Sequence, residues 1–192
     1  MKVLGIDPDT QASGWAIIED GPKVIKAGCV NTKHLKLRGL EAATQQGKKL
    51  AKLIVSLSSE VDAVIIESQQ KYKLSYRNNV NPNNLITLAY VSGAAMGASR
   101  NLELVRLVKP REWKGNVSKG ASHRRIIGQL EGWSTPDKIA KAAAVTEVDI
   151  EPSLKVGIDL DGLLGGGPWS EIIDAIGLAM YGLVYFKAAQ CK

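Results

Sequence analysis

The chain has 192 residues, of which 45% are hydrophobic and 23% are charged, a composition typical of a globular protein. We therefore expect a single domain over residues 1–192. The formal net charge of +6 favours a polyanion, such as a nucleic acid, as a partner. Two cysteines are too few for a disulfide framework, and the first residues lack the long apolar run of a signal peptide. These features favour a cytoplasmic protein.

The first part of the chain is predicted to form strands around one long helix. Short apolar runs between turn-rich segments predict strands over Lys2–Asp7, Gly14–Glu19 and Lys23–Val30. A helix is predicted over Lys36–Ser59, because apolar or small residues recur there every three or four positions. The apolar run Asp62–Ile66, which ends abruptly at Glu67, predicts a buried strand.

The second part of the chain alternates helices, one strand and polar loops. In chain order, the predicted elements are a loop over Ser68–Asn84, a helix over Pro82–Arg100, a strand over Glu103–Val108, a basic loop over 109–120, helices over Ser122–Leu130 and Thr135–Thr146, an acidic, Gly-rich loop insertion over 149–168 and a helix over Trp169–Phe186. The whole order predicts an α/β fold. Its mixed five-stranded sheet has three antiparallel strands followed by two parallel ones, and helices flank it.

The last predicted helix contains two unusual charges. The stretch Trp169–Phe186 is apolar on nearly every face, and Glu171 and Asp174 are its only charged residues. These charges argue against a membrane-spanning segment, and at positions i and i+3 they share one face of the helix. Acidic side chains are rarely buried unless a cation or a metal accompanies them. The sequence therefore predicts positive charge beside this pair.

Asp7 and Glu67 end two strands that we expect to be parallel neighbours, and ligand sites of open α/β sheets lie at such strand ends. Each acid also has a structural interpretation: a turn for Asp7, a solvated strand end for Glu67, and ion pairs for Glu171 and Asp174. Together, however, four close carboxylates repel one another unless cations bind them. A site of oxygen ligands suits Mg²⁺ or Mn²⁺ rather than Zn²⁺. Two such ions, roughly 3.5–4 Å apart, can hydrolyse a phosphodiester.

Three segments, Gly5–Pro8 followed by Gly14, Val64–Glu67 and Glu171–Ala179, follow one another over nearly the whole chain. In this order and spacing they resemble RuvC-type Holliday junction resolvases of the RNase H-like superfamily. The resemblance implies an RNase H-like fold and an endonuclease that cuts branched DNA, above all four-way junctions. Because a four-way junction is two-fold symmetric, we expect a homodimer that makes symmetric nicks. The implied metal-binding and catalytic tetrad, with two Mg²⁺ ions for which Mn²⁺ substitutes, is Asp7, Glu67, Glu171 and Asp174.

The resemblance also implies basic residues beside the reacting phosphate. Lys114, which ends the segment Pro110–Lys114, is the expected catalytic lysine, and Lys119 and Arg124 compete for the place of a second one. After Glu67, tyrosines alternate with basic residues, a pattern suited to base stacking and phosphate contacts. A solvated surface is the structural alternative. The predicted DNA-binding residues are Lys71, Tyr72, Lys73, Tyr76, Arg77, Lys109, Arg111, Lys119, His123 and Arg124.

Some residues depart from the family pattern. Asp9 stands where the family usually has Gly, and we expect it to close a turn rather than to bind metal. Glu171 stands where Asp or His is usual, which makes it the least typical member of the tetrad. The four tryptophans are expected to be core or near-core anchors.

Three other functions fit parts of the pattern. An actin-like or sugar-kinase ATPase would need two such domains and therefore a longer chain. A non-catalytic junction-binding protein would have no need for four mutually repelling acids. A nuclease of the same fold that cuts RNA or a wider range of branched DNA stays open as an alternative.

Overall fold

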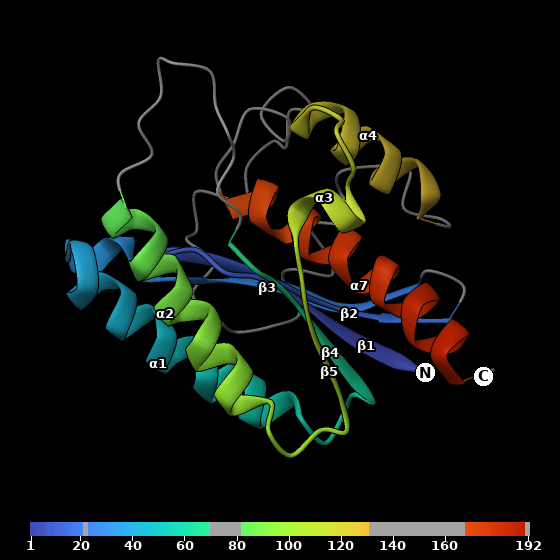
Figure 1. The fold of residues 1–192 in the computed structure, drawn as a ribbon, viewed down its shortest axis with the longest axis horizontal. Helices are drawn as coiled ribbons and strands as arrows, with labels where there is room; N and C mark the ends of the chain where they lie inside the picture. The colour runs from blue at the N-terminus through green and yellow to red at the C-terminus, as the bar shows by residue number, and fades with distance from the viewer. Residues whose placement is uncertain (21–22, 70–81, 131–167, 191–192) are drawn as a thin grey trace.

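The computed structural model describes residues 1–20, 23–69, 82–130 and 168–190, which form a mixed sheet with helices on both faces (Figure 1). The strands are β1 (Lys2–Asp7), β2 (Ala12–Glu19), β3 (Lys23–Asn31), β4 (Ala63–Glu67) and β5 (Leu104–Val108). The helices are the 3₁₀ helix η1 (Lys33–Leu35), α1 (Gly39–Leu57), α2 (Pro82–Ala98), α3 (Pro110–Trp113), α4 (Lys119–Gln129) and α7 (Pro168–Gln190). The strand order is β3-β2-β1-β4-β5. The first three strands are antiparallel, and β4 and β5 run parallel to β1, which confirms the predicted fold class.

Two elements near the N-terminus begin at other residues than predicted. β2 begins at Ala12 because the carboxylate of Asp9 accepts the backbone N–H groups of Gln11 (2.8 Å) and Ala12 (3.1 Å) and closes the turn early. α1 begins at Gly39 rather than at Lys36. Lys36 has a left-handed backbone, with φ 53°, which cannot continue a right-handed helix.

The prediction of a continuous loop over 109–120 was wrong, since α3 lies within it and α4 begins at Lys119. Pro110 supplies the φ angle of a first helical residue, and the Glu112 carboxylate accepts the backbone N–H of Lys109 at 3.1 Å. The helix predicted over Thr135–Thr146 lies outside the described residues, as do residues 149–167 of the predicted insertion and residues 70–81 of the predicted loop, whereas Pro168 begins α7.

Side chains of the central strands alternate between two cores, one on each face of the sheet. Ile6 of β1 joins the core beneath α1 and α2, whereas Val3 joins the core beneath α7. Asp7, four residues after Val3, therefore points to the α7 face. β4 lies beside β1 with Ile66 opposite Ile6, so Glu67 at the end of β4 points to the same face. The strand geometry thus directs both strand-end acids towards α7.

The helix α7 lies directly on the backbones of β1 and β2. A Cβ atom on Gly5 would overlap with the carbonyl oxygen of Ala175, and one on Gly14 would overlap with that of Glu171. The missing side chains at these two positions let the helix approach the sheet at backbone distance. Because Gly14 pairs with Asp7 in the β1/β2 register, this contact brings Glu171 beside Asp7.

By length and hydropathy alone, Trp169–Gln190 of α7 would pass for a membrane-crossing helix, and it is the one such helix among the described residues. In the protein, however, 61% of its most apolar stretch is buried. Ile173, Ile176 and Leu178 are fully buried and belong to the core between α7 and the sheet. We therefore interpret α7 as the central core helix that the sequence predicted.

Each edge strand carries a basic side chain that is paired within the protein. On β5, the Arg106 guanidinium lies 3.8 Å from the ring centroid of Tyr185 and 3.0 Å from a Glu112 carboxylate oxygen. On β3, the Lys26 ammonium lies 2.6 Å from a Glu60 carboxylate oxygen. These contacts tie both edges of the sheet to the segments beside them.

Gly14→Ala tests the close approach of α7. The added methyl group would overlap with helix backbone, which cannot move aside as a flexible side chain would. We expect the free energy of unfolding to fall by about 3 kcal/mol or more, the upper end of overpacking effects, in urea denaturation followed by circular dichroism. The control is Gly128→Ala in α4, where nothing lies near the new Cβ and alanine favours the helix. Wild-type stability of Gly14→Ala would contradict this packing.

Candidate metal centre

Three carboxylates from β1 and α7 gather at the carboxyl end of the parallel strands. Asp7, Glu171 and Asp174 each offer one oxygen, and these oxygens lie within 4.8 Å of one another. Asp7 reaches the site from the end of β1, and the other two come from the first turns of α7, which Gly14 holds against the sheet. Three of the four predicted metal ligands are thus brought together.

Glu67, the fourth predicted ligand, lies at the adjacent strand end but is held by other partners. Its Oε2 accepts a hydrogen bond from Nε1 of Trp113 at 2.7 Å and lies 3.5 Å from Nζ of Lys114. Burial raises the pKa of Glu67, the Lys114 charge and the Trp113 hydrogen bond oppose the rise, and Asp174 adds to it. Glu67 therefore belongs to the same electrostatic cluster.

Asp7 is the acid for which ionisation is least favourable. Its side chain is buried, and burial is the largest cause that raises its pKa well above the ordinary value. The negative charges of Glu67, Glu171 and Asp174 raise it further. The positive charge of Lys119 attracts this carboxylate, but burial and the three acids outweigh it. The charge of Asp7 is therefore the one that a bound cation would stabilise most.

Asp174, by contrast, contacts a histidine and a lysine. Its Oδ1 lies 3.1 Å from Nε2 of His123, and its Oδ2 lies 3.1 Å from Nζ of Lys119, which is also 3.5 Å from Glu171. Burial acts to raise the pKa of Asp174. The His123 hydrogen bond and the charges of Lys114 and Lys119 outweigh it and hold this pKa below its ordinary value. The positive charge expected beside the acid pair of α7 is present.

The donor set fits a hard divalent cation. Among the described residues, the one group of possible ligands consists of carboxylates alone, which suits Mg²⁺ or Mn²⁺ better than Zn²⁺. Asp9 does not join this group. Its carboxylate is engaged by the backbone N–H groups of Gln11 and Ala12, in the turn-closing role that we expected.

The predicted basic residues of the α3–α4 region differ in whether they contact the carboxylates. Lys114 and Lys119 contact them directly, whereas Lys109, Arg111 and Arg124 are exposed. This geometry favours Lys119 over Arg124 as the second basic residue of the site. The predicted DNA contacts that lie in residues 70–81, outside the described part of the chain, are Lys71, Tyr72, Lys73, Tyr76 and Arg77.

Two residues have roles at the site that sequence reasoning missed. Trp113, expected only as a core anchor, also binds Glu67, and His123, expected at the DNA surface, is fully buried against Asp174. The burial of His123 had a signal in the sequence, since it lies three residues before Ile126 and shares the inner face of α4. No sequence pattern pointed to either carboxylate partner.

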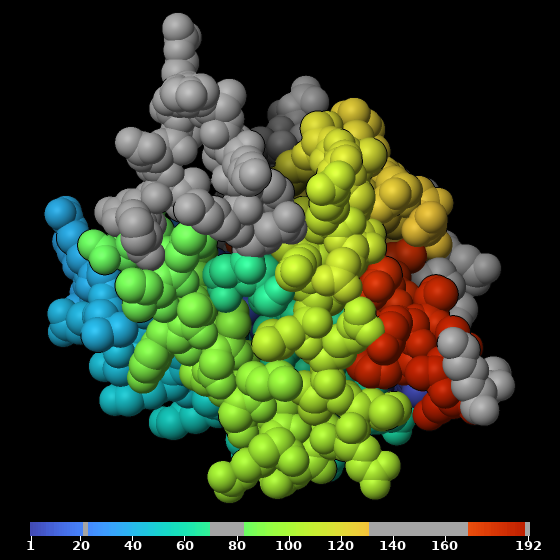
Figure 2. Space-filling model, viewed as in Figure 1, coloured from blue at the N-terminus to red at the C-terminus, as the bar shows by residue number. Residues whose placement is uncertain are grey.

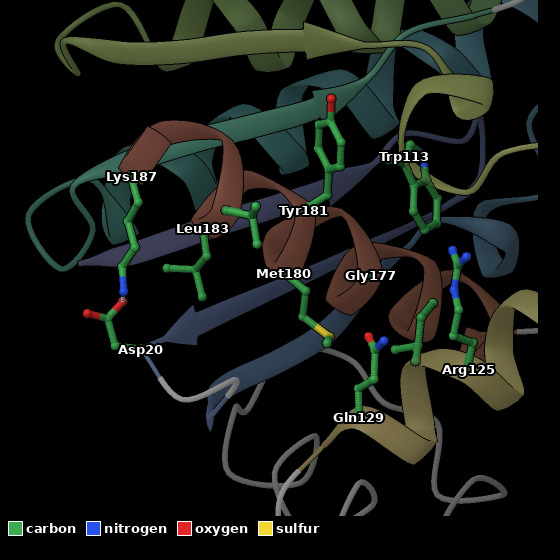
Figure 3. Close-up of a pocket in the computed structure, with 11 residues that line it drawn as sticks. Asp20, Trp113, Arg125, Gln129, Gly177, Met180, Tyr181, Leu183 and Lys187 are labelled. Carbon is green, nitrogen blue, oxygen red and sulfur yellow. Dashed lines mark ion pairs between the residues drawn. The ribbon is translucent and has the colours of Figure 1, made fainter. Parts of the chain in front are cut away.

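Two hollows lie near these elements. A small one of about 280 Å³ lies beside Glu67 and Lys114 and is lined in part by Pro8 and Leu85. A larger one of about 470 Å³ lies between α4 and α7 and runs from Trp113 and Arg125 to the Asp20–Lys187 ion pair (Figure 3). The larger hollow is lined by none of the four acids, whereas the small one is lined by Glu67 and therefore adjoins the candidate metal centre.

The sequence matches no family model and no curated protein. The fold does match solved structures. RuvC of T. thermophilus in complex with a Holliday junction substrate has a TM-score of 0.61 and 15% identity, with 98% of this chain and 96% of that chain covered. Another Thermus thermophilus RuvC structure has a TM-score of 0.55 and 14% identity, covering 98% and 97%. The yeast mitochondrial Holliday junction resolvase Ydc2 is more distant, with a TM-score of 0.44 and 11% identity. The chain therefore has the fold of RuvC.

Asp7 and Asp174 are expected to affect stability in opposite directions. Because the pKa of Asp7 is raised, its stabilising contribution is present below the ordinary value of 3.8 and is lost as the pH rises through the folded-state pKa. The pKa of Asp174 is lowered, so its contribution is present above 3.8 and is lost as the pH falls through the folded-state pKa. In EDTA at neutral pH, Asp7→Asn should raise the melting temperature and Asp174→Asn should lower it.

The difference for Asp7→Asn should shrink as the pH falls through the raised folded-state pKa of Asp7 towards 3.8, whereas the difference for Asp174→Asn should shrink only as the pH falls below 3.8. Thermal denaturation over a pH series, followed by circular dichroism, measures them. A lower melting temperature for Asp7→Asn than for wild type at neutral pH would show that another interaction of Asp7 outweighs the repulsion.

Proposed function

We propose that this chain is a structure-selective endonuclease that cleaves branched DNA, most specifically four-way junctions, by metal-dependent phosphodiester hydrolysis. The observation that carries the proposal is the carboxylate cluster at the parallel strand ends, faced by two lysines. The RuvC fold supports it, since one of the matched structures is a RuvC complex with a Holliday junction substrate.

Asp7, Glu67, Glu171 and Asp174 would hold two Mg²⁺ ions, with Mn²⁺ as a substitute. When bound, such ions activate a water for attack on phosphorus and stabilise the leaving oxygen. Lys114 and Lys119 already lie against the carboxylates, so their ammonium groups are placed to stabilise negative charge that develops on the phosphate. Trp113 holds one oxygen of Glu67 and leaves the other oxygen to a cation.

DNA would approach from the side of α3 and α4. The exposed side chains of Lys109, Arg111 and Arg124 lie there and would neutralise backbone phosphates, in keeping with the net charge of +6. Residues 70–81 follow the β4 end of the site in the chain and carry the alternating tyrosines and basic residues that suit unpaired bases.

A homodimer would match the two-fold symmetry of a four-way junction and would nick two opposed strands. The exposed face of α2 suits such an interface. Ile86 and Tyr90 are 62% and 45% exposed, and they share that face with Gly93 and Met96, with no charged residue among them. α2, drawn in green, is uncovered over most of its length in Figure 2. We therefore place the interface on α2 rather than on α1, whose exposed face also carries Lys48 and Lys52.

The proposed activity is tested with labelled four-way, three-way, flap and linear DNA, and with RNA duplexes. We expect cleavage of the four-way junction in Mg²⁺ and binding without cleavage in Ca²⁺, whose coordination is looser. Asp7→Asn and Asp174→Asn should each lower the cleavage rate by about 100-fold or more and leave junction binding in Ca²⁺ intact. Efficient cutting by either variant would exclude the metal mechanism. Equal cutting of flaps or RNA would favour the broader nuclease, and binding without any cutting would favour the non-catalytic alternative.

Ile86→Lys is expected to convert a dimer into a monomer, because it would bury a charge at the centre of the proposed interface. Light scattering coupled to size-exclusion chromatography measures the mass. Val184→Lys on α7, at a residue that is 72% exposed, is the control and should leave the dimer intact. A monomeric wild-type protein on junction DNA would contradict the dimer.

A further inference from the structure

His123 is buried at the inner side of the candidate metal centre. Its side chain is 0% exposed, and its described partner is Oδ1 of Asp174, 3.1 Å from Nε2. Within the described part of the chain, its other ring nitrogen, Nδ1, has no hydrogen-bond partner. His123 is therefore removed from the surface where DNA would bind, and the acid that it contacts among the described residues is Asp174.

The contact assigns the ring proton to Nε2. An ionised carboxylate accepts hydrogen bonds and donates none, so Nε2 must carry the hydrogen. A hydrogen on Nδ1 would be a buried donor without a described acceptor, which is unfavourable. A hydrogen on Nε2 satisfies both conditions.

The packing of α4 on α7 sets the position of this imidazole. A Cβ atom on Gly177 of α7 would lie 2.5 Å from Cδ1 of Ile126 and 2.6 Å from Cζ3 of Trp113, so the bare glycine lets α4 and α3 rest close to the helix. Ile126 is one turn after His123 on the same inner face of α4. The distance from His123 to Asp174 is therefore fixed by core packing.

The consequence for Asp174 is a fixed orientation. The terminal torsion of an aspartate is soft, so an unrestrained carboxylate samples many orientations. With Oδ1 held by His123 from the core, Oδ2 is directed to the side where Lys119 and Glu171 lie. Lys119 on that side also attracts Asp7, and one oxygen each of Asp7, Glu171 and Asp174 lies within 4.8 Å of the others.

We infer that His123 is a positioning residue that orients the Asp174 carboxylate for cation binding. The inference rests on the proposed function, because it assigns His123 to the same metal centre. It moves His123 from the DNA-binding surface to the core side of the site. Partners of this kind typically contribute about 10- to 100-fold to metal affinity.

Two matched variants test this role by Mn²⁺ binding to the full chain without DNA, measured by calorimetry. In His123→Gln the amide nitrogen reaches about as far as Nε2 and can still donate to Asp174. In His123→Asn the amide reaches only the position of Nδ1. We expect Mn²⁺ binding by His123→Asn to be about 10- to 100-fold weaker than wild type, and His123→Gln to recover most of the affinity.

His34→Gln is the control, because His34 is exposed and is the one other histidine of the chain. The presence of two histidines also makes the tautomer of His123 readable by ¹⁵N NMR of wild-type protein, where we expect hydrogen on Nε2. Wild-type Mn²⁺ affinity in His123→Asn, equal losses in both variants, or hydrogen on Nδ1 alone would each overturn the inference.

These outcomes are separate from those for the nuclease. Junction cleavage in Mg²⁺ with unchanged Mn²⁺ affinity in His123→Asn would overturn the role of His123 and leave the proposed function in place. Absence of Mn²⁺ binding by wild-type protein would overturn both.

Discussion

The contact between α7 and the bare backbones of β1 and β2 is the constraint on which the rest of the structure depends. Gly5 and Gly14 let the helix lie where no side chain could intervene. The β1/β2 register then places Gly14 opposite Asp7, so the first turns of the helix meet the end of the central strand. Sheet alternation brings Glu67 to the same face. The acid cluster is therefore a consequence of backbone packing.

The acids of the cluster differ in their hydrogen-bond and ion-pair partners, and the surroundings therefore shift their pKa values differently. Asp174 has a histidine and a lysine at its two oxygens, and Glu67 has an indole and a lysine, whereas the pKa of Asp7 is raised by burial and by three neighbouring charges. A site built for stability alone would pair every acid. The repulsion retained around Asp7 is the feature that a divalent cation would relieve, and it separates a binding centre from an ordinary network of ion pairs.

The sequence was sufficient to predict the sheet, the long helices and the acids, because each had a strong local signal. The predicted bounds of β1 were correct. Asp9 closes the turn between β1 and β2, as expected. Short elements were missed, since η1 and α3 have too few residues to show a period. The contacts of Trp113 and His123 were also missed. Trp113 and Glu67 are separated by 46 positions in the sequence, and His123 and Asp174 by 51. Contacts between residues so far apart depend on how the helices pack rather than on any pattern along the chain.

The paired basic residues on β3 and β5 have a consequence for how copies of the chain can meet. An edge strand exposes unpaired backbone groups that invite another strand, and charged side chains on the edge make such pairing unfavourable. Arg106 and Lys26 place a charge on each edge of this sheet, and their partners hold both charges in place. Extension of the sheet from one molecule into the next is thereby disfavoured. The proposed dimer would then form through helical surfaces, where association can close at two copies rather than continue into a fibre.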